Sequence, residues 1–377
     1  MELSSEDTLR LNVLLANKPL AVRIDESRMI VYGLSEQGEA KIQLNPAGRP
    51  EQYVRKVREL LSGHILGSPG GYPVYLRRWT RMGQMRDESL EQLLMLGEPE
   101  AVVAAVCSPG LTAELARRAW WAMEDAENAR RMLGHRAVVE SPIGQELARY
   151  LVEYLPFETE TEKMTESVRL VLQPGLLDQA TRLELWKKSG RKQAYLVGFL
   201  AAVPDDLPQP VAARADAEAC AARLEPLAAA ANPYAQLLLR VLAPSGQTFL
   251  KTLEAVLKKP PTQEVVTAAF DVARAYFRAL RPEGDPDQTL PQLLEDAERL
   301  GGEAGSEALH ACLAVAPELR GDMQAMRICS GLGYGVLRPL IGGSSAMGSL
   351  LRRKLEPALG AVLEQIARLR GLRKSAQ

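Results

Sequence analysis

The residues with the clearest chemical potential form a basic cluster around one tryptophan. Four arginines surround an indole in a short stretch of chain: Arg77, Arg78, Trp79, Arg81 and Arg86. Guanidinium groups bind phosphate, and an indole ring can stack on a nucleic-acid base. The cluster is therefore a candidate site for an anionic partner such as RNA, although a solvated charged surface explains the same residues.

Two adjacent tryptophans, Trp120 and Trp121, form a second candidate. Neighbouring residues of a helix point about 100° apart, so the two rings do not share one narrow buried stripe. We expect one ring to pack inside on the side of Arg117, because residues four positions apart share a helix face. The other ring is expected to meet a neighbouring helix or to serve as an exposed anchor for a partner.

The sequence contains an internal echo around these tryptophans. The pattern V-x-x-P-G-L-x5-R-x3-W begins at Val106 and again 65 positions later at Val171. In each copy we expect a helix to end before Pro-Gly and another to begin after it. Each copy also places an arginine four residues before a tryptophan, where the two side chains can stack. Chance similarity and duplication of a helical repeat are both open.

The four cysteines are far apart and include no C-x-x-C pair: Cys107, Cys220, Cys312 and Cys329. Such spacing is typical of reduced core residues. A sulfur carrier would need an exposed thiol of low pKa. Cys107 precedes Ser-Pro-Gly at an expected helix C-terminus, where the helix dipole disfavours a thiolate. Cys329, beside a glycine-rich turn, is the one cysteine retained as a sulfur-carrier candidate.

No residue pattern of a known catalytic or cofactor site occurs in the sequence. The three histidines are isolated, and H-E-x-x-H, Walker and G-x-S-x-G motifs are missing. The acidic group Glu158, Glu160, Glu162 and Glu166 suits the start of a helix. The chain has 46 Lys+Arg and 47 Asp+Glu, which excludes a polybasic design overall. We expect no metal, no cofactor and no catalytic residue.

The N-terminal 75 residues differ in pattern from the rest and predict a small α+β module. A helix is expected over 4–17, with Leu9, Val13 and Leu14 as its apolar positions and Ser4 as its N-cap. Alternating runs at 20–24, 29–32 and 40–44 predict a three-stranded meander with one solvated face. A further amphipathic helix is expected over 52–62.

The remainder predicts a mainly α-helical body of HEAT-like or irregular helical hairpins, with a compact bundle as the open alternative. We expect a hairpin array over 76–206, a helical continuation over 207–280 and a C-terminal helical segment over 281–377. Residues 204–210 are expected to be a linker, and the last helix spans 349–369. This end carries seven cations and is a second candidate for an anionic partner: Arg352, Arg353, Lys354, Arg368, Arg370, Arg373 and Lys374.

Three stretches of this sequence resemble the DsrS proteins, which are encoded in the dissimilatory sulfite reductase gene clusters of sulfur-oxidising bacteria. They are residues 67–94, residues 97–103 and the segment 116–123 with its paired tryptophans. The resemblance implies a soluble cytoplasmic protein associated with the oxidation of stored sulfur, and it brings no assigned catalytic residue. The polar N-terminus and short uncharged stretches likewise predict neither a signal peptide nor a membrane span.

Together these patterns predict a non-catalytic accessory or regulatory protein of cytoplasmic sulfur oxidation that binds a macromolecular partner. A protein of the sulfur-oxidation machinery is the expected partner, because helix arrays offer long binding surfaces. An RNA-binding post-transcriptional regulator is the first alternative. A cysteine-dependent sulfur-transfer protein is the second. The sequence leaves open the partner's identity and the oligomeric state.

Overall fold

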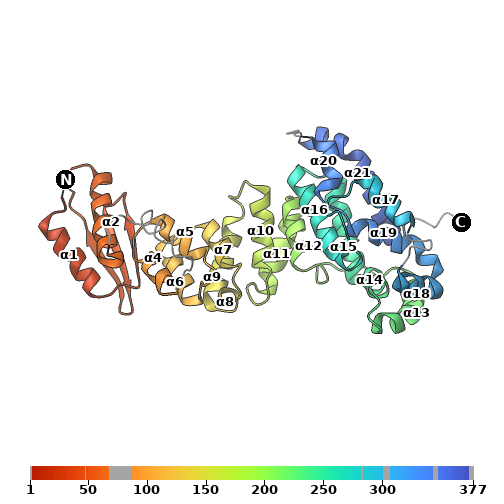
Figure 1. The fold of residues 1–377 in the computed structure, drawn as a ribbon, viewed down its shortest axis with the longest axis horizontal. Helices are drawn as coiled ribbons and strands as arrows, with labels where there is room; N and C mark the ends of the chain where they lie inside the picture. Colours follow the sequence, from red (N-terminus) through yellow and green to blue (C-terminus); the bar gives the residue numbers. More distant parts are fainter. Residues whose placement is uncertain are drawn as a thin grey trace. The chain divides into compact units, whose positions relative to one another are not determined.

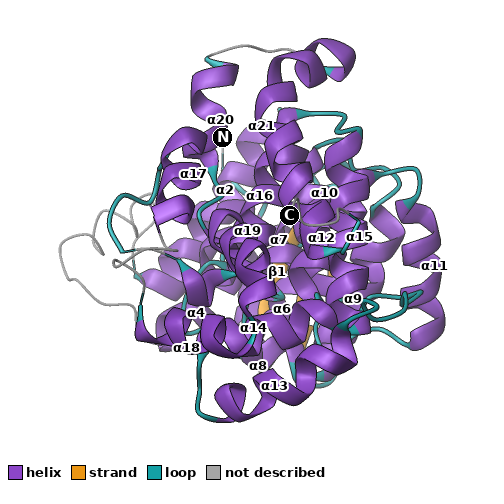
Figure 2. Cartoon of the chain, turned by 90° about the vertical axis from the view of Figure 1, so that its right-hand side faces the viewer, coloured by secondary structure: helices purple, strands orange, loops and turns teal. Residues whose placement is uncertain are grey.

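The chain divides into two compact units in the computed structural model. The structure describes residues 2–46, 48–67, 87–281, 283–299, 306–342 and 347–372. One unit comprises Met1–Pro156 with Gln173–Leu177, and the other comprises Phe157–Leu172 with Asp178–Gln377. Helices dominate both, and one small antiparallel sheet lies near the N-terminus (Figures 1 and 2). The predicted fold class, mainly α with a small N-terminal α+β module, is confirmed.

The N-terminal module has the predicted order of helix, meander and helix. Its elements are α1 (Ser5–Ala16), β1 (Ala21–Asp25), β2 (Ile30–Ser35), β3 (Gly38–Gln43) and α2 (Pro50–Leu66). The sheet order is β1-β2-β3, and both pairings are antiparallel. Ser4 caps α1 as predicted, because its hydroxyl accepts a hydrogen bond from the Asp7 N–H at 3.1 Å.

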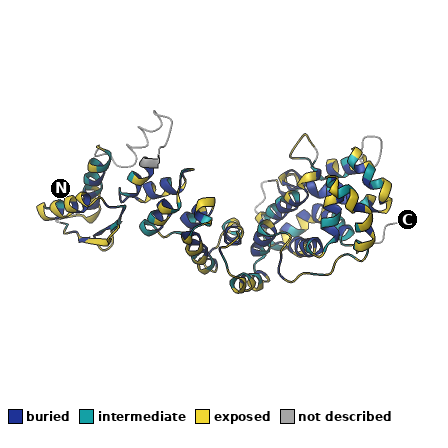
Figure 3. Ribbon diagram, turned by 90° about the horizontal axis from the view of Figure 1, so that it is seen from below, coloured by how far each residue is buried: buried dark blue, intermediate teal, exposed yellow. Residues whose placement is uncertain are grey.

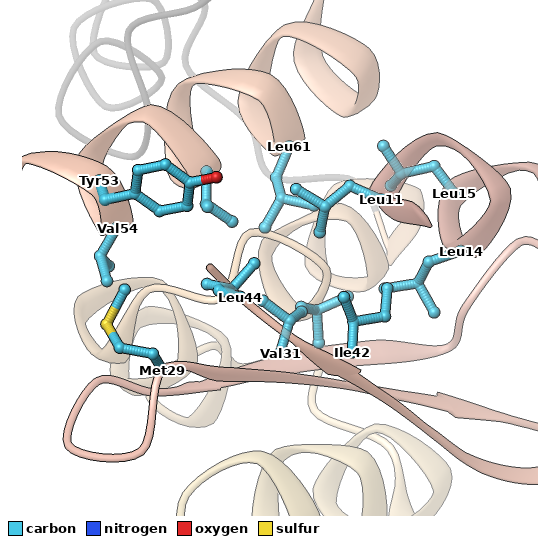
Figure 4. Packing of buried hydrophobic residues seen from close by; sticks show 12 residues of the cluster. Leu11, Leu14, Leu15, Met29, Val31, Ile42, Leu44, Tyr53, Val54 and Leu61 are labelled. Carbon is cyan, nitrogen blue, oxygen red and sulfur yellow. The ribbon is translucent and has the colours of Figure 1, made fainter. Parts of the chain in front are cut away.

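The module's core lies between the sheet and its two helices (Figure 4). Side chains of α1 and α2 meet one face of the sheet there, and Tyr53 and Leu61 of α2 are fully buried. The predicted apolar face of α1 is partly wrong. Leu11, Leu14 and Leu15 are buried, whereas Leu9 is 64% and Val13 53% exposed.

The second face of the sheet is not fully solvated, which corrects the expectation of one wetted face. Ala21 and Ile30, which point to that side, are buried. Helices α4 (Asp87–Leu94) and α6 (Ala113–Ala122) pack against β1. The polar Arg23 and Lys41 on this face gave the strands an amphipathic pattern. Arg23 is nevertheless half-buried, because a long side chain can pack along its stem while its charge is paired.

The remaining helices of this first unit pack as short hairpins. They are α5 (Pro99–Val106), α7 (Ala126–Met132), α8 (Arg136–Val139) and α9 (Pro142–Tyr154), besides α4 and α6. Helix α5 contacts α4, α6 and α7, while α9 contacts α6, α7 and α8. Each of these helices therefore packs on near neighbours in sequence, as in a hairpin array.

In the second unit the last helix packs against helices that lie much earlier in the chain. Its helices are α10 (Thr161–Val171), α11 (Gln179–Ser189), α12 (Gln193–Ala202), α13 (Ala217–Ala229), α14 (Pro233–Leu242), α15 (Pro244–Lys258), α16 (Gln263–Tyr276), α17 (Leu290–Arg299), α18 (Glu307–Val315), α19 (Arg320–Ser330), α20 (Tyr334–Ile341) and α21 (Gly348–Leu369). Short 3-10 turns occur at Arg278–Leu280 and Pro317–Leu319. Helix α21 packs back on α15, α19 and α20. Helices α12 and α15 are buried over most of their surface, whereas helices such as α13 and α21 also carry exposed residues (Figure 3).

The proline-rich segment 204–210, expected to be a linker, lies inside the second unit and is held there by side chains. Asp205 pairs with Arg240 at 2.6 Å, Asp206 pairs with Arg182 at 2.7 Å, and Leu207 is buried. Proline marks a break in helical structure equally well in a tethered loop and in a free linker. Among the described helices, none has the length and apolar character needed to cross a membrane.

Candidate interaction surfaces

The basic cluster predicted around Trp79 lies in a segment that the structure does not describe. Arg77, Arg78, Trp79, Arg81 and Arg86 all lie outside the residues that the structure describes. Their role in binding an anionic partner therefore stays a prediction.

Trp120 is a core residue of the first unit. Its side chain is 4% exposed on α6, and its ring meets Tyr150 of α9 edge to face at a centroid distance of 4.8 Å. The indole Nε1 donates a hydrogen bond to the Glu146 carboxylate at 3.0 Å. Burial with a satisfied polar atom is the usual environment of a structural tryptophan. Trp120 therefore links α6 to α9 and is not available to a partner.

Trp121 joins α6 to the sheet. The Arg23 guanidinium lies 4.8 Å from the Trp121 ring centroid and 4.7 Å from that of Tyr32. Glu39 accepts hydrogen bonds from Trp121 Nε1 and from Arg23, each at 3.0 Å. The Trp121 carbonyl also accepts one from Arg23 at 3.3 Å. The buried ring is therefore Trp120, and the expectation that the ring on the Arg117 side packs inside is wrong. Trp121 is the outer tryptophan, and of the two roles considered for it the structure favours contact with a neighbouring element.

The internal echo predicts helix boundaries correctly but not the stacked side chains. Helices α5 and α10 end before Pro-Gly, and α6 and α11 begin after it. Arg117 pairs with Glu114 at 2.7 Å, and the cation over the Trp121 ring is Arg23. In the second copy Arg182 instead pairs with Asp206. Opposite charges were within reach of both arginines, and a charge-assisted hydrogen bond outweighs a partly exposed cation–π contact.

Most of the thiols are sealed from solvent. Cys220, Cys312 and Cys329 are buried, and burial raises the pKa of each. For the carrier candidate Cys329 the pKa rises to about 12, so the thiol is neutral and inaccessible. Cys107 caps the C-terminus of α5, as predicted, but it is exposed, so the expectation that all four cysteines are core residues is wrong for this one.

The acidic group lies at a helix start, as its sequence predicts. Glu160 is the N-cap residue of α10, and Glu162 lies in the first turn. The Glu158 carboxylate is buried and accepts hydrogen bonds from the backbone N–H groups of Thr159 and Glu160 at 2.9 and 3.1 Å. These contacts give the carboxylates a structural role at the positive end of the helix.

Two grooves that the sequence analysis did not identify flank the connector between α1 and β1. One has a volume of about 630 Å³ and lies between the end of α1 and the β2–β3 hairpin. The other, of about 360 Å³, is bounded by α2, α4 and Arg118 of α6. Both are lined by Lys18, Pro19 and Leu20. The exposed Lys18 has a φ of +48°, a left-handed conformation that non-glycine residues seldom adopt.

Small residues on the sheet create the larger groove. Gly33 lets α1 approach closely, since a Cβ there would lie 2.4 Å from Leu14 Cδ1. Beyond Leu14 the next strand presents only Ala40, which is exposed. Glu36 and Lys18 place opposite charges on the rim. The local sequence predicts a turn here, but the hollow depends on how closely a helix packs on the sheet.

The second predicted basic cluster is divided by the fold. Arg370 pairs with Glu254 of α15, whereas Arg373 and Lys374 lie outside the described residues. Lys354 and Arg368 are on α21; Lys354 has an interaction partner, and Arg368 lies close to Asp322. Arg352 and Arg353 line a groove of about 280 Å³ between α15 and α21.

Comparison with known proteins identifies no relative of this chain. No protein-family model, no curated protein and no solved structure matches the chain significantly. The surfaces described above are therefore interpreted from their own geometry and chemistry.

Proposed function

We propose that this chain is a non-catalytic accessory protein of cytoplasmic sulfur oxidation and that it acts by binding a macromolecular partner. The sulfur context rests on the resemblance of residues 67–94, 97–103 and 116–123 to DsrS proteins. The binding role rests on one observation, the pair of grooves that share Lys18, Pro19 and Leu20 as a common wall. Such adjoining concave surfaces suit a partner chain that covers the connector from both sides.

The geometry of the connector supports this assignment. The left-handed conformation of Lys18 is less favourable than the right-handed one by about 1 kcal/mol for a residue with a Cβ. Backbone strain of this kind is often found where function requires it. Here it holds an exposed ammonium group between the two grooves, where a partner's carboxylate can pair with it.

The chemistry of the thiols favours binding over sulfur transfer. Three of the four cysteines are buried with raised pKa values. The exposed Cys107 caps the C-terminus of α5 and does not lie at a helix N-terminus, the position typical of reactive cysteines. Sulfur transfer needs the opposite setting, an accessible thiolate.

The test is affinity capture with the full-length tagged chain from lysate of the sulfur-grown source organism. Capture is carried out with and without RNase and at two salt concentrations. We expect a defined sulfur-metabolism protein whose recovery does not change with RNase. Recovery of RNA that is lost at high salt would instead support the RNA-binding regulator, since phosphate contacts release counterions.

Two variants test the grooves directly. Ala40→Phe fills the larger groove, and phenylalanine suits a strand better than alanine. Lys18→Gly removes the shared cation, and glycine adopts the left-handed conformation freely. Both should fold normally and lose the partner. Arg55→Ala is the control, because Arg55 is exposed on α2 and makes one surface pair, with Glu59. Equal recovery by all three variants would contradict the assignment to these grooves.

A further inference from the structure

A groove on the second unit combines an apolar floor with a positive rim. Leu257 of α15 and Leu359 and Leu363 of α21 form the floor of this hollow of about 280 Å³. Its rim carries three cations and one carboxylate, namely Lys258, Arg352, Arg353 and Glu356. We name this feature the α15–α21 groove.

The two arginines of the rim have no ion-pair or hydrogen-bond partner among the described residues. Lys258 pairs with Glu254 at 2.7 Å. Arg352 and Arg353, by contrast, form no ion pair or hydrogen bond within the part of the chain that the structure describes. Arg370, the C-cap residue of α21, is paired with Glu254. The α15–α21 groove therefore offers two uncompensated guanidinium groups beside apolar side chains, a combination that suits an anionic and amphipathic occupant.

Gly360 independently indicates that a partner approaches the backbone of α21 closely. It lies in the interior of α21, is exposed, and lines the groove. A Cβ placed on it would meet nothing within 4 Å. Glycine is among the least favourable residues in a helix interior, and packing within this chain gives no reason for it here. Because glycine has no Cβ, a side chain of a partner can contact the helix backbone at Gly360 directly.

We propose that the α15–α21 groove docks an acidic amphipathic helix of a partner protein. An apolar side chain of that helix would lie over Leu257 and Leu359 beside Gly360, and flanking carboxylates would pair with Arg352 and Arg353. The volume of about 280 Å³ is below the usual range of small-molecule pockets, roughly 300–1,000 Å³, and suits an anchoring side chain. A nucleic acid carries phosphates along its whole backbone and has no aliphatic side chain to cover the leucines, so a protein segment is favoured.

This docking surface does not rest on the grooves around Lys18, which belong to the other unit. Its test uses defined peptides and needs no cellular partner. The probe is a fluorescein-labelled peptide of about 15 residues, because shorter helices are marginal in water. It carries leucines at helical spacing with glutamates between them. Three matched peptides replace glutamate by glutamine, glutamate by lysine, or leucine by serine.

Fluorescence anisotropy with the full chain should give a clear ranking. The glutamate–leucine peptide binds, and each matched peptide binds at least about tenfold more weakly. Binding of the glutamate–leucine peptide weakens with salt, as expected for a partly exposed charge contact. Failure of this peptide to bind, or equal binding of the serine peptide, would overturn the proposal.

Variants of the chain locate the contact. The double variant Arg352→Glu/Arg353→Glu should lose the glutamate peptide at least about tenfold and prefer the lysine peptide. Lys354→Glu is the matched control, since it changes charge on α21 at a residue that does not line the groove. Gly360→Leu fills the groove and improves helix propensity, so it should abolish binding in a well-folded chain. Undiminished binding by the double variant or by Gly360→Leu would refute the docking site, and the capture experiment with Ala40→Phe would be unaffected.

Discussion

Replacing Asp7 by asparagine should loosen the N-terminal module more than any exposed substitution on the same helix. The Asp7 side chain is fully buried. Its carboxylate accepts hydrogen bonds from the Tyr53 hydroxyl at 2.5 Å and from the Asn45 backbone N–H at 2.9 Å. The Asn45 side-chain amide adds a longer contact of 3.4 Å. One carboxylate thus joins α1, the β3–α2 loop and α2.

The size of the effect follows from these contacts. A hydrogen bond to a charged group contributes about 1.5–3 kcal/mol, and an unsatisfied buried donor costs a similar amount. The two close donors bond the same oxygen, Oδ2, so the amide oxygen of asparagine can accept from both, but without the negative charge. Its N–H₂ group then replaces Oδ1 and faces the Asn45 side-chain amide. We therefore expect Asp7→Asn to lower the free energy of unfolding of the module by about 3 kcal/mol, and Tyr53→Phe by about 2 kcal/mol. The double variant should lose less than the sum, because the two residues share one bond.

The same contact predicts a pH dependence. Burial raises the pKa of Asp7, but hydrogen bonds from Tyr53, Asn45 and Ser4 outweigh it and hold the pKa below its ordinary value. A carboxyl whose folded pKa is depressed stabilises the fold above its unfolded pKa, near 4. This contribution is lost as the pH falls below about 4 through the lower folded pKa. The difference in the module's free energy of unfolding between the wild type and Asp7→Asn should therefore be largest at neutral pH and should shrink as the pH falls below about 4.

The assay is amide hydrogen exchange by mass spectrometry on the full chain, because two compact units need not unfold together. Peptides from α1 and α2 report on the module. Asp178→Asn is the control, since Asp178 is an exposed N-cap of α11 in the other unit. If α1 and α2 exchange at wild-type rates in Asp7→Asn, or if the difference persists undiminished at pH 3, the carboxylate does not hold the module together.

Three further outcomes follow from single contacts. Trp121→Phe removes the donor to Glu39 and should lower the free energy of unfolding of the first unit, measured by hydrogen exchange in β1 and α6, by about 1–2 kcal/mol; in a Glu39→Gln background the same change should have a smaller effect. A maleimide should label Cys107 alone in the folded chain and all four cysteines in urea, and rapid native labelling of Cys329 would contradict its burial. Tyr276→Phe should leave thermal stability unchanged or raise it, because this buried hydroxyl has no hydrogen-bond partner among the described residues; a loss above about 1 kcal/mol would reveal one.

The local sequence predicted the elements well where each depends on residues close in the chain. The cap at Ser4, the order of the meander strands and the end of α5 before Pro-Gly are set by backbone chemistry within a few residues. The last helix was expected over 349–369 and is observed as Gly348–Leu369. Such signals need no knowledge of the rest of the fold.

The buried side of a helix was harder to assign. Two apolar pairs with a spacing of four residues lie on α1, Leu9 with Val13 and Leu11 with Leu15. Both have helical spacing, so periodicity alone does not choose between them. The structure buries the second set because it faces the sheet and α2. The same limit explains why the sequence did not reveal that α4 and α6 pack against β1.

The sequence by itself determined a mainly helical chain with a small N-terminal sheet, the positions of its caps and breaks, and the residue types available for binding. Only the tertiary structure decided which of them are accessible. Trp121 meets Arg23 across 98 positions of sequence, and Arg370 reaches Glu254 across 116. Partners so far apart are brought together by the path of the whole chain, whereas caps and turns form from neighbouring residues. That path encloses Trp120 and Cys329 and leaves Arg352 and Arg353 facing an open groove.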